Sequence, residues 1–200
     1  NGRLWVAMPN GRDFMAGDLL GTTTGPLKFT ENDYLSEGGT FQVPGSAGKI
    51  VAMQAMTTPD TSLGEGDLLL ICEQAVYAVN VPFDRDQWKA TTYPVVRALL
   101  LNAGGTGGWS TQCVNSDVFF RAQDGIRSVI LARREFNSWG NTPVSREVQP
   151  TMDHDNRLML PMCSSAVFDN RLLMAYSPHR RGMNIAHEGV VVLEFDAISG

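Results

Sequence analysis

The stretch Ser116–Leu131, SDVFFRAQDGIRSVIL, decides the fold. It places two runs of β-forming residues on either side of Asp124-Gly125. Asp-Gly between two such runs is among the strongest hairpin signals, because both turn positions then tolerate a positive φ. We therefore predict antiparallel strands at Val118–Arg121 and Ile126–Leu131. We expect Gly125→Val to cost about 1–2 kcal/mol.

Three other segments have the same construction: a cluster of Asn, Asp, Gly or Ser, an apolar strand, a polar turn and a second apolar strand. They read GRLWVAMPNGRDFMAGDL from Gly2, GDLLLICEQAVYAVNV from Gly66 and DNRLLMAYSP…GVVVLEFDA from Asp169. The intervals are 65, 50 and 53 residues when counted from Gly2, Asp67, Asp117 and Asn170. All-β units spaced by about 50 residues are typical of the blades of a β-propeller.

A short β-like run precedes three of these hairpins: KIVAMQAM from Lys49, STQCVN from Ser110 and SSAVF from Ser164. Each would add a strand to its blade, and VVRALLL from Val95 would close the second blade or open the third. We therefore expect an all-β chain with about three and a half blades, fewer than the roughly 4–8 of a closed propeller. Residues 1–200 would form a single β-propeller segment of a longer chain, as the missing initial Met also indicates. The alternative is that the sheets pack against other chains.

Two connections stand out as candidate contact segments. The last hairpin carries an insertion, SPHRRGMNIAHE at Ser177–Glu188, where a propeller would present a binding surface. The connection Arg134–Pro161 is long enough to wrap a neighbouring blade or subunit. The candidate interface residues in these segments are Arg134, Trp139, Arg146, His179, Arg180 and Arg181.

The remaining connections carry weaker signals. TENDYLSEGG from Thr30 and PFDRDQW from Pro82 are expected to form short helical turns. The glycine-rich run NAGGTGGW from Asn102 is expected to be a flexible connection, because it has no Lys and leads into no helix. The connection tryptophans could be interface anchors or lids on the core, and the sequence leaves both open for Trp88, Trp109 and Trp139.

Composition excludes several classes of protein. A hydrophobic content of 43% is enough for a core, and a net charge of −5 without a basic stripe argues against nucleic-acid affinity. The apolar runs are far shorter than the roughly 20 residues of a membrane span, and no targeting leader is visible. Three cysteines, without zinc spacing, are expected to be reduced and structural.

No motif of nucleophilic catalysis or phosphate binding is present. Asp153-His154-Asp155 could be a metal or acid–base cluster, but adjacent side chains point in different directions, so we interpret it as a solvated loop. Asp84 and Asp86 could serve a glycosidase, although their separation in space is not given by the sequence. We predict no catalytic residue, no cofactor and no metal site.

Three stretches resemble virion structural proteins of tailed bacteriophages. They are GKIVAMQAMTTPDTSLGEGDLLLICEQAVYAVNVPFDRDQW (48–88), VFFRAQDGIRSVILARREFNSWGNTPVSREV (118–148) and VFDNRLLMAYSP (167–178). The proteins that they resemble are akin to the propeller-containing tail tubular or nozzle components of short-tailed phages. These phrases are structural and transfer no catalytic residue.

The resemblance implies a non-enzymatic structural component of a tail or neck ring, located in the virion and assembled in the host cytoplasm. Its partners would be identical subunits in a ring, a hexamer by analogy, together with other tail or neck proteins. Genomic DNA would pass without specific binding, which suits a negative net charge. Two alternatives remain open: a propeller that recognises a host-surface glycan or receptor, and a propeller glycoside hydrolase.

Overall fold

The computed structural model describes residues 3–19, 29, 40–56, 66–82, 85–92, 94–130 and 142–195. These residues form an all-β structure of four antiparallel sheets. Sheet A contains β1 (Arg3–Ala7), β2 (Asp13–Leu19) and β3 (Phe41–Gln42), and sheet B contains β4 (Ile50–Ala55), β5 (Leu68–Cys72), β6 (Ala75–Val79) and β7 (Val96–Leu101). Sheet C contains β8 (Thr111–Val114), β9 (Asp117–Ala122) and β10 (Gly125–Ser128), and sheet D contains β11 (Ser165–Phe168), β12 (Arg171–Arg181) and β13 (Asn184–Glu194).

Short helical segments lie in the connections. They are η2 (Gly45–Ala47), η4 (Arg85–Ala90), η5 (Gly108–Ser110), η7 (Arg146–Val148), α2 (Gln149–Met152) and η8 (Arg157–Met162). The helical turn predicted from Pro82 is therefore present as η4, whereas the turn predicted from Thr30 lies outside the described residues. No helix in the described part of the chain is long and apolar enough to cross a membrane.

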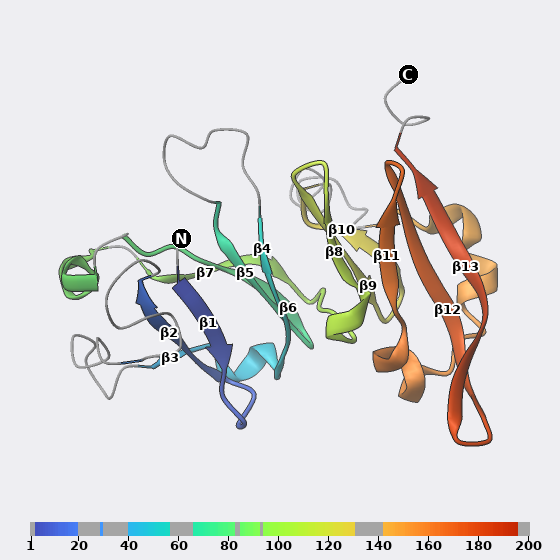
Figure 1. Cartoon of the computed structure of the whole chain (residues 1–200), viewed down its shortest axis with the longest axis horizontal. Helices are drawn as coiled ribbons and strands as arrows, with labels where there is room; N and C mark the ends of the chain where they lie inside the picture. The colour runs from blue at the N-terminus through green and yellow to red at the C-terminus, as the bar shows by residue number, and fades with distance from the viewer. Residues whose placement is uncertain are drawn as a thin grey trace.

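The four sheets lie side by side in chain order, with sheets A and D at opposite ends (Figure 1). Apolar side chains fill each of the three spaces between neighbouring sheets. Successive residues of a strand point to opposite faces, so Leu70 packs toward sheet A while Leu69 packs toward sheet C. Both faces of sheet B are thereby buried, which explains why its central strands read as unbroken apolar runs, LLLIC and AVYAV.

The four predicted hairpins are confirmed as β1–β2, β5–β6, β9–β10 and β12–β13. The three predicted preceding strands are β4, β8 and β11, and β7 closes sheet B. One boundary was wrong: β10 ends at Ser128, and the backbone at Val129 and Ile130 is helical. The Asp117 carboxylate accepts hydrogen bonds from the Ser128 hydroxyl and from the Ile130 N–H, which draws the chain out of the ladder.

The β9–β10 turn is Gln123-Asp124, one residue earlier than predicted, because Gly125 pairs with Ala122 as the first residue of β10. Neither turn residue has a positive φ, whereas Gly125 has a φ of +147°. A Cβ at this position would lie 2.6 Å from Ser145 Oγ and 2.7 Å from Pro143 Cβ. Ser145 Oγ also accepts the Ile126 N–H at 2.9 Å, so the segment after residue 141 packs directly on the turn. Glycine is therefore required here for space as well as for backbone conformation.

The prediction of a flexible glycine-rich connection was wrong. Gly104, Gly105 and Gly107 are buried where sheet B meets sheet C. A Cβ on Gly104 would lie 2.3 Å from the carbonyl oxygen of Cys72, and the Gly105 N–H donates to that same oxygen at 2.9 Å. The glycines allow the backbone to approach the neighbouring strand closely, and the run is a packed part of the core.

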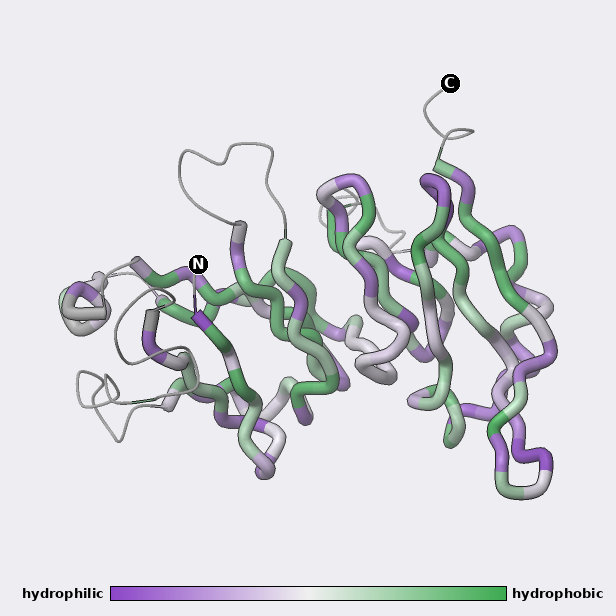
Figure 2. Tube along the Cα trace, in the orientation of Figure 1, coloured by the Kyte–Doolittle hydropathy of each residue, from purple (hydrophilic) through white to green (hydrophobic). Residues whose placement is uncertain are grey.

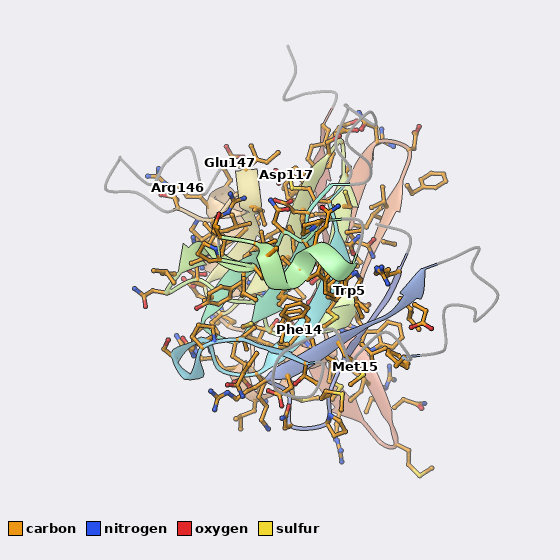
Figure 3. The ribbon with its side chains drawn as sticks, turned by 90° about the vertical axis from the view of Figure 1, so that its left-hand side faces the viewer. Trp5, Phe14, Met15, Asp117, Arg146 and Glu147 are labelled. Atoms are coloured by element: carbon orange, nitrogen blue, oxygen red, sulfur yellow. The ribbon has the colours of Figure 1, made fainter. Side chains whose placement is uncertain are left out.

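Trp88 takes the core role, one of the two that the sequence left open. Trp88 is buried against sheet A, where its ring stacks on Trp5 at 6.1 Å and its Nε1 donates to the Pro82 carbonyl at 2.7 Å. Figure 3 shows Trp5 and Phe14 together in this aromatic cluster, with ring centroids 6.0 Å apart. Trp109 is exposed, and Trp139 lies outside the described residues.

None of the three cysteines forms a disulfide. Burial, and to a smaller extent the nearby Glu73 carboxylate, raise the pKa of the Cys72 thiol to about 12. Such a thiol stays protonated and behaves as a small hydrophobic side chain.

Candidate interaction surface

Strands β12 and β13, with 11 residues each, extend sheet D beyond the other sheets. β11 pairs with β12 only as far as Met174, whereas β12 and β13 remain paired out to Arg181 and Asn184. Residues 178–187 therefore form a two-stranded ribbon, which we call the arm, and Figure 1 shows it projecting past the lower edge of the stack. The predicted insertion at the last hairpin is thus continuous strand and not a loop.

The tip of the arm is a two-residue turn, Gly182-Met183. Gly182 has a φ of +66°, and Met183 is not in the positive region, which is the pattern of a type II′ hairpin turn. This turn matches the right-handed twist of the two strands, so the paired strands can continue to the tip. The Met183 side chain is fully exposed there.

The arm carries positive charge without compensation. Its sequence, PHRRGMNIAH, contains two arginines and no acidic residue, and His179, Arg180 and Arg181 are all exposed. The rest of the chain has 14 basic and 21 acidic residues, a net charge of −7. Among the described residues, no ion pair involves Arg180 or Arg181.

A buried ion pair fixes the root of the arm. Arg121 of β9 pairs with Asp155, and their side chains are only 1% and 3% exposed. The other carboxylate oxygen of Asp155 accepts the Ser177 N–H at 2.8 Å, at a residue whose φ is +51°. A second contact places His187 Nε2 3.2 Å from the Met162 carbonyl. The arm therefore leaves the sheet in a direction set by sheet C and by η8.

The interpretation of Asp153-His154-Asp155 as a solvated loop was wrong for Asp155. Asp153 and His154 are exposed, and His154 Nδ1 contacts the Pro150 carbonyl at 2.8 Å. Asp155 turns inward to Arg121, a partner 34 residues away in the chain. No local pattern in the sequence could have indicated this pair.

Cys163 lies beside the ion pair. The pKa of its thiol is raised to about 11, mainly by burial; the Arg121 guanidinium lowers this pKa and the Asp155 carboxylate raises it. Because the burial contribution is largest, the thiol stays neutral and adds no charge to the site. Two other guanidinium nitrogens of Arg121, Nε and Nη1, are buried without an acceptor among the described residues. The buried positive charge of Arg121 therefore depends on the Asp155 carboxylate for its compensation.

The outer face of sheet D has an apolar patch beside the Arg171–Glu194 ion pair. Its inner face places Leu172, Met174 and Val191 in the core shared with sheet C. The alternate residues point the other way, with Leu173 opposite Val192 and Ala175 opposite Val190. Val190, Val192 and Phe168 are 53%, 49% and 71% exposed. Figure 2 shows hydrophobic residues running along the strands of this sheet at the end of the stack.

A polar pocket of about 220 Å³ opens where the turns of sheets B and C meet. Its lining residues are Glu73, Gln74, Asn102, Ala103, Gly104, Ala122, Gln123, Asp124 and Arg127. Arg127 is held by the Asp124 carboxylate. Side-chain amides and carboxylates on an apolar floor could hydrogen-bond a small polar molecule.

The structure brings only part of the predicted interface together. His179, Arg180 and Arg181 share the arm. Arg146 is exposed on η7, and Figure 3 shows it at the upper end of the molecule, away from the arm. Arg134 and Trp139 lie outside the described residues, as do Asp84 and the side chain of Asp86. The described part of the 134–161 connection packs on its own chain, where Val144 N–H donates to the Ile126 carbonyl.

Among the described residues, no group of three or more His, Cys, Asp or Glu side chains could hold a metal ion. No protein-family model matches the chain, and no curated protein is significantly similar to it.

Proposed function

We propose that the chain is a β-propeller segment of a structural virion protein, a tail or neck component of a tailed bacteriophage without enzymatic activity. The resemblance of residues 48–88, 118–148 and 167–178 to such proteins supports the phage assignment. The face-to-face stacking of four antiparallel sheets in chain order supports the propeller.

One observation carries the structural role: sheet D is built like an internal sheet. Its strands contain the runs LLMA and VVVL, comparable to the runs of sheet B that are buried on both faces. Its outer face nevertheless has no covering sheet among the described residues. A further sheet packed on this face would continue the stack toward the roughly 4–8 blades of a closed propeller.

In the proposed assembly, identical subunits form a ring, a hexamer by the analogy drawn from the sequence, in contact with other tail or neck proteins. The ring would surround the path by which DNA leaves the particle. A net charge of −5 suits a conduit, because a basic lining would hold the phosphates.

A cryo-electron map of the particles that carry this chain tests the proposal, with a closed propeller in a ring as the expected result. A charged residue on the outer face of sheet D provides the matched biochemical test. Val192→Glu is expected to reduce incorporation into particles by about tenfold or more, since it places a charge in an apolar contact. Leu158→Glu, an equally drastic change at an exposed apolar residue of η8, should leave incorporation unchanged. Equal incorporation of both variants would refute the role of this face.

The polar pocket between sheets B and C favours a second candidate, a propeller that binds a glycan. Its amides and carboxylates match the donors and acceptors of sugar hydroxyls. A glycan array with the purified chain tests this candidate. Binding that is lost in Gln123→Ala would support it, and a chain that retains no glycan would exclude it.

A further inference from the structure

We propose that the arm, residues 178–187, docks on an acidic surface of a second copy of this chain. This inference rests on the ring of identical subunits proposed above and adds the contact and its chemistry. It is carried by the arm's shape, its anchored root, its uncompensated charge and its apolar tip.

The arm is held in place before any partner binds. A two-stranded ribbon has no core of its own and is marginally stable in isolation. Here its root is fixed by the hydrogen bond from Ser177 N–H to Asp155 and by the ion pair of Asp155 with the buried Arg121. His187 adds a contact to η8. A contact element that is already ordered loses less conformational freedom on association, so more of its interaction energy appears as affinity.

The charge of the arm is complementary to the rest of the molecule. The arm contributes +2 and contains no carboxylate, while the remaining residues sum to −7. Copies of this chain therefore attract one another through the arm and repel one another elsewhere. Complementary fields of this kind steer association and fix the orientation of the partners.

The tip favours a protein partner over nucleic acid. Met183 is fully exposed beside Arg180 and Arg181, and Ile185 is also exposed. Methionine and arginine are enriched in protein interfaces, where an apolar contact gains from leaving water. Two arginines are few compared with the roughly 6–10 phosphate contacts of a protein with strongly salt-dependent DNA affinity.

Sedimentation velocity on the intact protein tests the proposal. The variant Arg180→Glu/Arg181→Glu reverses the charge of the arm, and the control Arg97→Glu/Arg157→Glu reverses two exposed arginines elsewhere. Each changes the net charge from −5 to −9, so general repulsion is matched. We expect the arm variant to weaken self-association by about tenfold or more at about 50 mM salt and the control by much less. Raising salt to about 500 mM should reduce the difference, because exposed charges are then screened. Equal effects of the two variants, or a wild-type protein that stays monomeric, would overturn the proposal.

A photo-reactive amino acid in place of Met183 identifies the partner directly. Cross-links from this position to a second copy of the chain would support the proposal, and cross-links to DNA or to a different protein would overturn it. The two proposals can also fail separately. If particles with the Arg180→Glu/Arg181→Glu variant still contain an intact ring, the ring proposal is retained and the arm is not one of its subunit contacts.

Discussion

Replacing Asp155 by alanine is expected to destabilise the fold far more than its position in a polar connection indicates. The substitution removes two acceptors at once, the partner of the Arg121 guanidinium and the acceptor of the Ser177 N–H. Arg121 would remain at 1% exposure with no carboxylate to balance it.

The magnitude follows from burial. Breaking a buried ion pair by removing one partner costs about 3–5 kcal/mol, because the other charge is left uncompensated. The Ser177 N–H adds about 1 kcal/mol, since this residue is half-buried and water replaces part of the lost bond. The sum is about 4–6 kcal/mol, which for a chain of this length lowers the Tm by roughly 10–20 °C.

Guanidinium chloride unfolding of Asp155→Ala, Arg121→Met and the double variant measures the pair. The double variant removes both ions, so its destabilisation should be smaller than the sum of the two single changes by about 2 kcal/mol or more. Arg171→Met provides the control, because the side chains of the Arg171–Glu194 pair are 40% and 48% exposed and the pair should contribute less than about 1 kcal/mol. A loss below about 1 kcal/mol for Asp155→Ala, or additive single changes, would refute the view that this pair is buried and coupled.

Three further outcomes are expected. Gly125→Ala should cost about 2–4 kcal/mol in the same unfolding assay, because it combines a positive φ with the clash against the following segment. This clash also raises the cost of Gly125→Val above the roughly 1–2 kcal/mol expected from the sequence. Gly182→Ala should cost about 1–2 kcal/mol because nothing lies near its Cβ. In the folded protein a thiol reagent should modify Cys113 rapidly and leave Cys72 and Cys163 unmodified until unfolding; rapid reaction of all three would contradict their burial. The pKa values of Cys72 and Cys163 are raised to about 12 and about 11 in the folded protein. Both thiols therefore stay protonated in the folded protein at pH values where they ionise in the unfolded chain. The contribution of these two thiols to stability should therefore be constant below about pH 8.5 and be lost as the pH rises toward 11, and a flat profile between about pH 8.5 and 11 would contradict the shifts.

The hairpins could be predicted because their determinants are local. Apolar alternation and turn residues such as Asn10-Gly11 and Asp124-Gly125 act over a few positions. The ladders form at these signals, with the β9–β10 turn one residue earlier than predicted. The arm was missed for the same reason. Its sequence, PHRRGMNIAH, lacks an apolar alternation, so only Gly182 marks the turn at its tip.

The remaining features depend on contacts between distant segments. The Asp155 carboxylate can be buried only because it pairs with Arg121 of sheet C. Nothing in the local sequence distinguishes either residue from an exposed Asp or Arg. The same holds for Gly104, whose missing side chain matters only because the Cys72 carbonyl lies against it. Sequence patterns record which residues favour a strand or a turn, but not which strand will lie across from them.

Energetics connect the outer face of sheet D with the arm. Complete burial of a valine or phenylalanine side chain contributes about 1.5–3 kcal/mol, and the neighbours in the sheet already shield about half of Val190 and Val192. Covering these two residues and Phe168 would therefore contribute about 3–4 kcal/mol in total. Such a gain corresponds to millimolar affinity at best, since about 4 kcal/mol is equivalent to a Kd of about 1 mM. A sheet that is continuous with this chain could pack on the face with so little energy, because its local concentration is already high. A separate subunit could not be held by this face alone and would need further contacts. The anchored and charged arm is placed to provide such contacts.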